Sequence, residues 1–427
     1  MKLNYKRTIL IGLAFLSISA FWQMYDNIVP LILSNTFEMD ETLTGAIMAG
    51  DNVLALFLLP LFGSFSDKVN TPIGKRMPFI LVGTAFAVTL LMILPYAANT
   101  KNLPLFVSGL FFLLISMGTY RSPAVALMPD LTPKNLRSRG NAIINLMGAA
   151  GGLYTLGMIS FLVESGPTPN YYPLAISVAV LMVVSVVVLF LTIKENKLRE
   201  QIQAEDFGEE VKEVKADASK SEKLPKDVFR SLVFILISVA FWFIAYNGVT
   251  TAFSRYATRV WGLEGGEYAN CLMVATVAAI ISYIPIGSIA AKIGRKKTIL
   301  IGIILLGSCF FVAGLFDTYS PIMMLVFCVV GFAWAAIGVN SYPMVVEMAS
   351  AGDVGKYTGY YYTFSMTAQV ITPILSGWLL ENVGYRTLFP YSVCFCILAF
   401  ITMSQVKHGD SKPIPKKSAL ESLDVDD

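Results

Sequence analysis

Four ionisable residues lie inside stretches of the sequence that are otherwise apolar: Asp26, Asp51, Arg121 and Glu347. A charge near the centre of a membrane helix costs about 2.5–3.5 kcal/mol even on insertion scales, so residues of this kind are functional candidates. A carboxylate in a medium of low dielectric constant is neutralised more readily than one in water, which makes Asp26 the candidate proton carrier. Arg121 would respond to its charge. The structural alternative is an Asp–Arg pair that only locks helices together.

Asp51 and Glu347 could each act in gating. Asp51 is a second candidate for proton coupling, but the helix that carries it could instead turn the carboxylate toward a gate. Glu347 lies near a helix end, where a long side chain reaches the interface, and we expect it to act in gating rather than in substrate binding.

A second set of residues could bind a substrate rich in hydroxyl groups. Amide side chains both donate to and accept from hydroxyls, and an indole face packs against the apolar face of a pyranose ring. The alternative is that amides join helices, at about 0.6 kcal/mol per contact, and that the tryptophans only pack. The candidates for substrate binding are Trp22, Gln23, Asn27, Asn52, Tyr246, Asn247, Trp334, Asn340 and Gln369.

The composition places the chain in a broad class. Of its 427 residues, 55% are hydrophobic and 14% charged, which predicts a polytopic membrane protein in contact with lipid. The net charge of +3 is too small to suggest a nucleic-acid partner. The five cysteines lie in apolar runs without a CxxC spacing. His408 is the only histidine, and no HExxH, GxSxG or GxxxxGK(S/T) motif occurs. We therefore expect no enzyme activity, no metal site and no cofactor.

Twelve apolar runs are long enough to cross a bilayer, which needs about 20 helical residues. Cations gather in alternate loops, so the positive-inside rule predicts a multi-pass protein of the plasma membrane with both termini cytoplasmic. Arg255, Arg259 and Arg386 are exceptions, which a bias over the whole chain tolerates. The apolar run after Arg7 has no small-residue cleavage site, and we expect it to be a retained first span. The predicted spans are roughly 8–33, 43–63, 77–98, 103–129, 140–163, 173–193, 230–252, 268–291, 298–316, 320–348, 357–380 and 386–406.

The loop after the second span, GSFSDKVNTPIGKRMPFI at 63–80, has a specific spacing. Ser66-Asp67-Lys68 is followed, after five residues, by Gly74-Lys75-Arg76-Met77-Pro78-Phe79-Ile80. This pattern resembles the loop between helices 2 and 3 of the sucrose/proton symporters, a branch of the major facilitator superfamily (MFS) near the glycoside–pentoside–hexuronide cation symporters. The alternative is a charged turn that only sets topology. The resemblance implies a gating loop that includes Gly63, Asp67, Lys68, Gly74 and Arg76.

The fourth span and its loop carry a second resemblance. The stretch 123–131 is similar to Pro-Cys-Arg-Ala-Leu-Leu-Ala-Asp-Leu of the sucrose transporters, with Asp130 matching. Val125 stands where that family has arginine, and Arg121 lies one helical turn earlier. The MFS fold that the resemblance implies lines a central cavity with helices 1, 4, 7 and 10. Asp26 and Arg121 would then face the same water-filled space, and Asp130 would belong to the gating set.

The two halves of the chain repeat. Ala20-Phe21-Trp22 recurs 220 residues later as Ala240-Phe241-Trp242, and the same offset relates Asn27 to Asn247. Parallel repeats of this kind are typical of the two MFS halves. The fold class we predict is an all-α membrane protein with twelve transmembrane helices in two pseudo-symmetric six-helix bundles. The predicted domains are a bundle at 1–193, a cytoplasmic linker at 194–229, a bundle at 230–407 and a cytoplasmic tail at 408–427.

Together these features predict a secondary active transporter. We expect a monomer that works by alternating access and imports a sugar or glycoside together with a proton. One alternative is a proton-coupled exporter of a hydrophobic compound or another metabolite, which apolar and aromatic helices also permit. An alternative from another class is a membrane sensor that transports nothing.

Overall fold

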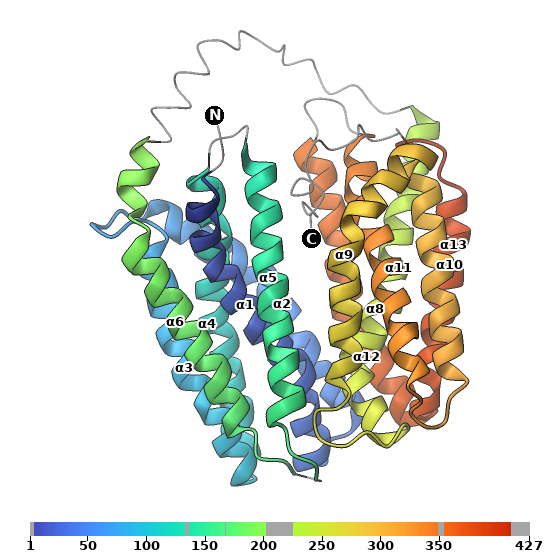
Figure 1. Cartoon of the computed structure of the whole chain (residues 1–427), viewed down its shortest axis with the longest axis horizontal. Helices are drawn as coiled ribbons and strands as arrows, with labels where there is room; N and C mark the ends of the chain where they lie inside the picture. Colours follow the sequence, from blue (N-terminus) through green and yellow to red (C-terminus); the bar gives the residue numbers. More distant parts are fainter. Residues whose placement is uncertain (1–3, 133–135, 167, 202–224, 349–353, 411–427) are drawn as a thin grey trace. The chain divides into compact units, whose positions relative to one another are not determined.

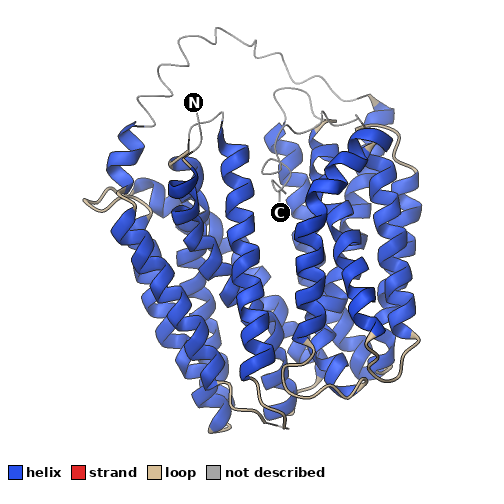
Figure 2. Cartoon of the chain, in the orientation of Figure 1, coloured by secondary structure: helices blue, strands red, loops and turns tan. Residues whose placement is uncertain are grey.

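The computed structural model describes residues 4–132, 136–166, 168–201, 225–348 and 354–410. Within these ranges all regular structure is helical, apart from an isolated bridge between Thr71 and Gly74 (Figure 2). Most of the predicted linker, at 202–224, and of the predicted tail, at 411–427, lies outside the described residues. The first six long helices are α1 Tyr5–Leu31, which continues as a π-helical turn at Ile32–Thr36, α2 Glu41–Lys68, α3 Met77–Asn99, α4 Leu103–Asp130, α5 Arg137–Leu162 and α6 Tyr172–Thr192 (Figure 1). The other six are α8 Lys226–Arg259, α9 Ala269–Ile293, α10 Arg295–Gly314, α11 Ile322–Val346, α12 Val354–Asn382 and α13 Leu388–Ser404.

Eleven of the helices in the described part of the chain are long and apolar enough to cross a membrane. The remaining long helix, α12, is less apolar because its first half is rich in tyrosine, threonine and serine. Two helices extend well beyond the spans predicted from hydropathy. α2 continues to Lys68, and α8 runs from Lys226 to Arg259. Hydropathy detects only the apolar part of a helix, whereas the backbone hydrogen bonds continue through polar residues.

The chain forms two compact units. Unit 1 contains residues 1–38 and 50–216, and unit 2 contains residues 39–49 and 217–427. Helix α2 therefore contributes to both, because the residues up to Ala49 cluster with unit 2 and those from Gly50 cluster with unit 1.

Small residues let the helices of unit 1 approach closely. In this unit α1 packs on α5 and α6, and α3 packs on α4 and α6. A side chain at Gly151 of α5 would overlap the backbone of Leu16 in α1. This use of glycine at a helix contact is typical of membrane bundles, in which close packing rather than water exclusion holds helices together.

The helices of unit 2 pair in the same order. α8 packs on α12 and α13, and α10 packs on α11 and α13. The first helix of each unit thus meets the fifth and sixth, and the third meets the fourth and sixth. This is the pattern expected from the repeat in the sequence.

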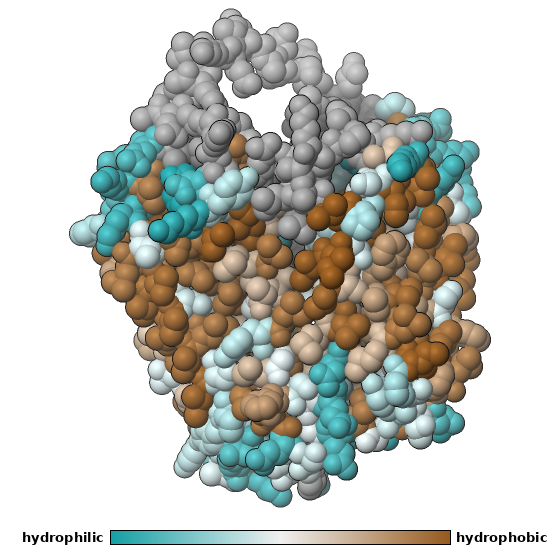
Figure 3. All heavy atoms as spheres, viewed as in Figure 1, coloured by the Kyte–Doolittle hydropathy of each residue, from teal (hydrophilic) through white to brown (hydrophobic). Residues whose placement is uncertain are grey.

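Side-chain polarity follows the helix axes. In the space-filling view, hydrophobic residues cover the middle of the visible helices and hydrophilic residues gather toward their ends (Figure 3). The exposed large side chains include Phe86 on α3, Val184 on α6 and Ile304 on α10. A broad apolar surface of this kind suits contact with lipid.

Candidate functional site

Three of the four predicted intramembrane charges interact within unit 1. Asp26 on α1, Asp51 on α2 and Arg121 on α4 act on one another electrostatically. All three side chains are partly accessible. We call these residues the charged triad. When all three are ionised, two carboxylates and one guanidinium carry a formal net charge of −1.

The residues around the charged triad keep its charges in place. The guanidinium of Arg121 lies over the ring of Trp22, 5.5 Å from the ring centroid. A cation–π contact of this kind is worth about 2 kcal/mol when it is shielded from water. Asn52 donates to Asp51 Oδ1 from its backbone nitrogen at 2.6 Å and from its side-chain nitrogen at 2.8 Å. Arg121 and Asp51 thus each contact a residue that was predicted to bind substrate, Trp22 and Asn52 respectively.

Helix α1 places the other candidates of unit 1 near Asp26. Trp22 lies one turn before Asp26, on the same face of the helix. The Nε1 atom of Trp22 is buried and has no hydrogen-bond partner among the described residues. Asn27 is buried and donates from Nδ2 to the backbone oxygen of Gln23 at 2.9 Å, while Gln23 itself is partly accessible. The structure thus brings Trp22, Asn52 and the charged triad together, whereas Asn27 faces the helix packing.

Unit 2 contains an aromatic stack. The rings of Tyr246 on α8 and Trp334 on α11 lie parallel, with centroids 3.8 Å apart and planes at 9°. Phe243 meets Trp334 edge to face at 5.4 Å. Tyr246 therefore already covers one face of the indole that was expected to pack on a sugar ring. A ligand could therefore contact only the part of the Tyr246–Trp334 stack that is still accessible.

The amides of unit 2 fall into two groups. Asn247 on α8 and Gln369 on α12 are partly accessible, and Asn247 Nδ2 has no hydrogen-bond partner among the described residues. Asn340 on α11 is buried, and its Nδ2 donates to the backbone oxygen of Ala336 at 2.9 Å. Asn340 is thus a packing residue in this structure, because its donor is used within its own helix.

The loop between α2 and α3 is organised by one arginine. Arg76 is buried, and its Nη2 lies 2.5 Å from Asp67 Oδ1 while its Nε lies 2.9 Å from Asp130 Oδ2. Its Nη1 donates to Ser66 Oγ and to the backbone oxygen of Gly63. Burial opposes the charge of Arg76, but the hydrogen bond to Asp130 and the charges of Asp130 and Asp67 raise its pKa above the ordinary value. The structure therefore joins Asp67 and Arg76, which belong to one loop, with Asp130, which lies 54 positions after Arg76.

The remaining residues of the predicted gating set have their own local environments. Lys68 is exposed at the end of α2. Gly74 has a φ of +127°, which disfavours any other residue there. Glu347, at the end of α11 in unit 2, forms an ion pair with Arg295 at the start of α10.

A buried ionic cluster in unit 2 was missed by the sequence reasoning. Glu41 at the start of α2 accepts from Arg255 of α8 and from the hydroxyl of Tyr385, and Arg259 lies 3.5 Å from its Oε1. Both Glu41 and Arg255 are buried. From the sequence alone, Arg255 and Arg259 are no more than tolerated exceptions to the positive-inside rule. The position of Arg255 next to a long apolar run could have indicated this cluster, because a buried arginine needs a carboxylate partner.

The sequence matches a known family over nearly its whole length. The family described as "MFS/sugar transport protein" matches residues 10–403. The chain is 31% identical over 163 residues to a putative proline/betaine transporter of Staphylococcus haemolyticus, a match that covers 37% of this chain and 34% of that protein. It is 28% identical over 120 residues to a sucrose transport protein of Arabidopsis thaliana, covering 24% of this chain and 20% of that protein. The chain thus spans about a third or less of these two relatives.

Two further similarities extend along most of the chain. A glucuronide carrier protein homolog of Escherichia coli is 25% identical over 417 residues, with 86% of this chain and 85% of that protein covered. The solved structure of a POT family transporter in complex with 5-aminolevulinic acid aligns with a TM-score of 0.69 at 12% identity, covering 93% of this chain and 94% of that one. This likeness confirms the predicted MFS fold. The match over residues 10–403 shows that the chain belongs to the MFS/sugar transport protein family, whose members are transporters rather than enzymes.

Proposed function

We propose that the protein imports a sugar or glycoside together with a proton by alternating access. In this proposal the two units are the bundles that alternate, and the protein is a monomer of the plasma membrane with both termini in the cytoplasm.

The observation that carries the coupling part of the proposal is the formal charge of the charged triad. Asp26, Asp51 and Arg121 lie within a helical bundle, where an unbalanced charge is costly. With a formal net charge of −1, the triad becomes neutral when it binds one proton. Asn52 donates two hydrogen bonds to Asp51, whereas no residue in the described part of the chain donates one to Asp26, so Asp26 is the carboxylate that we assign as the proton carrier.

The substrate part of the proposal is supported by polar and aromatic groups in each unit. Trp22 keeps an unused indole donor beside the charged triad, and Asn247 keeps an unused amide donor near the Tyr246–Trp334 stack. Gln369 is partly accessible on α12. Donors of this kind suit hydroxyl groups, and rings stack on aromatic side chains. Relatives named for sucrose and glucuronide transport agree with this class of substrate.

The proposal can be tested with purified protein in liposomes. We expect a labelled sugar or glycoside from a panel of monosaccharides, disaccharides and glucuronides to show counterflow. The same compound should accumulate when the outside is made more acidic than the inside. A sodium gradient at constant pH serves as the control, since the triad would also be neutralised by another monovalent cation.

Three outcomes would contradict the proposal. Accumulation driven by sodium alone would identify a different coupling ion. Export of a hydrophobic compound without sugar counterflow would favour the exporter alternative. Absence of counterflow for every compound of either class would favour the sensor.

A further inference from the structure

A buried carboxylate outside the charged triad holds the loop between α2 and α3. Glu195 lies three residues after α6, at the start of the helical residues 195–201, and it is 1% exposed. Its two carboxylate oxygens accept from the backbone nitrogens of Lys75 at 2.7 Å, Arg76 at 3.0 and 3.1 Å, and Met77 at 3.0 Å. These N–H groups precede and begin α3, where they have no partner within the helix. A negative charge at this helix end is also favoured by the helix dipole.

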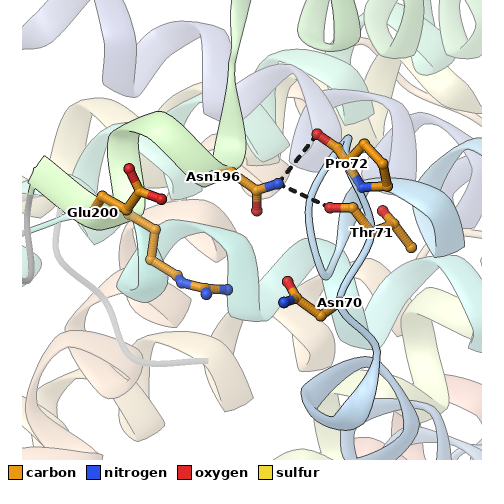
Figure 4. Close-up of a pocket in the computed structure, with 6 residues that line it drawn as sticks. Asn70, Thr71, Pro72, Asn196 and Glu200 are labelled. Carbon is orange, nitrogen blue, oxygen red and sulfur yellow. Dashed lines mark hydrogen bonds between the residues drawn. The ribbon is translucent and has the colours of Figure 1, made fainter.

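The loop is shaped to receive this carboxylate. A Cβ atom at Gly74 would overlap the side chain of Glu195, and the φ of Gly74 is +127°. The next residue, Asn196, donates from Nδ2 to the backbone oxygens of Thr71 at 2.8 Å and Pro72 at 3.1 Å (Figure 4). Residues 195 and 196 thus hold both sides of the turn at Gly74.

The same arrangement recurs in unit 2 in a weaker form. The 220-residue offset of the internal repeat relates Gly74 to Gly294, which also has a positive φ, +94°. Asp410, which follows α13 as Glu195 follows α6, accepts from the backbone nitrogen of Lys296 at 2.8 Å, near the start of α10. Asp410 is exposed, and this is its one backbone hydrogen bond among those of the described residues. In each unit a carboxylate that follows the sixth helix therefore accepts from a backbone nitrogen at the start of the third helix.

Arg76 connects the cap to the ion pairs of the loop. Its backbone nitrogen is held by Glu195, while its side chain holds Asp67 and Asp130. The backbone position of a residue decides where its side chain can reach. We propose that Glu195 is a positioning residue for transport, which fixes the first turn of α3 so that Arg76 contacts Asp67 and Asp130, and that Asp410 is its weaker counterpart in unit 2. The part of this inference that concerns transport rests on the proposed function.

Amide hydrogen exchange tests the positioning role without any substrate. The full-length protein in detergent is compared with the variants Glu195→Gln, Asp410→Asn and Glu200→Gln, of which the last removes an exposed carboxylate from the same helical segment. Because Glu195→Gln removes the charged acceptor of these hydrogen bonds, we expect exchange at residues 75–77 to become about tenfold faster or more, which corresponds to about 1.4 kcal/mol or more. Exchange there should be unchanged in the other two variants. Unchanged exchange at 75–77 in Glu195→Gln would overturn the inference, whether or not a substrate is known.

Transport kinetics test the consequence. At equal abundance in the membrane, Glu195→Gln should lower the maximal transport rate about tenfold with an unchanged KM, because the hydrogen bonds of Glu195 go to residues 75–77 and not to a proposed substrate residue. Adding Asp67→Asn to Glu195→Gln should lower the rate little further, since both act through Arg76, whereas adding Asp410→Asn should act independently. Glu195→Asp, which keeps the charge, should retain more activity than Glu195→Gln. The positioning role would be contradicted if the rate of the double variant fell by the product of the two single-variant effects of Glu195→Gln and Asp67→Asn. A changed KM in Glu195→Gln would also contradict it.

Discussion

Replacing Asp26 by asparagine tests the coupling mechanism most directly. The substitution keeps the shape of the side chain and most of its hydrogen-bonding capacity but removes the titratable group. In the wild-type protein the charged triad needs one proton to become neutral. In Asp26→Asn, the charges of Asp51 and Arg121 already balance, so no proton is required. The proposed mechanism therefore predicts a change from one coupled proton per cycle to none.

The size of the effect follows from this stoichiometry. A pH difference of one unit corresponds to about 1.36 kcal/mol per proton, which is a tenfold concentration ratio. With the membrane potential clamped at zero, the wild-type protein should accumulate sugar up to about tenfold per pH unit. Asp26→Asn should reach a ratio of about one at every pH difference, while sugar exchange without net proton movement continues in part.

The assay is uptake of labelled sugar into proteoliposomes at pH differences of zero, one and two units. Asp40→Asn is the matched control, because it removes an exposed carboxylate outside the charged triad. It should accumulate sugar as the wild type does. If Asp26→Asn still concentrates sugar against its gradient, Asp26 is not the proton carrier, and Asp51 becomes the next candidate.

Three further predictions concern topology, the gating loop and stability. Cysteines introduced at Asn70 and Asp40 should be labelled by impermeant reagents from opposite sides of the membrane, with Asn70 reacting only from the cytoplasm; labelling of both from one side would refute the topology. Asp67→Asn should lower the initial uptake rate at normal membrane abundance. It should cost about 1 kcal/mol of stability or less, since the Asp67 side chain is 63% exposed. An unchanged initial uptake rate would mean that the loop only sets the topology. Glu41→Gln should lower the free energy of unfolding by about 3–5 kcal/mol because it leaves Arg255 buried without its main counter-ion. Combining Glu41→Gln with Arg255→Met should recover most of this loss, as measured by thermal unfolding. A double variant as unstable as the single one would contradict this reasoning.

Much of the fold could be predicted from local sequence properties. The length and hydropathy of the apolar runs indicated the number of helices, because a bilayer imposes a nearly fixed length on each span. The recurrence of Ala20-Phe21-Trp22 at Ala240-Phe241-Trp242 indicated two similar halves, and the helix pairs of the two units follow the same order. Asp26, Asp51 and Arg121 could be singled out because a charge in an apolar run is costly wherever its partner lies.

The partners themselves could not be predicted in this way. Hydropathy fixes where a helix crosses the membrane but not how the helix is rotated about its axis or which neighbour it meets. Asn340 and Asn247 look alike in the sequence, yet one is buried in packing and the other keeps an unused donor. Tyr246 and Trp334, 88 positions apart, stack only because α8 and α11 are held together in the folded unit.

The same limit applies to the charged residues at the helix ends. The sequence by itself determined that Arg76 and Asp67 belong to one loop, because nine residues cannot separate them far. Only the tertiary structure brought Asp130 and the carboxylate of Glu195 to the same loop, and Glu41 to Arg255. A buried charge must find an opposite charge or several hydrogen bonds, but the chain distance to that partner is unrestricted. The sequence therefore determined which residues need partners, and the packing of the helices decided which partners they have.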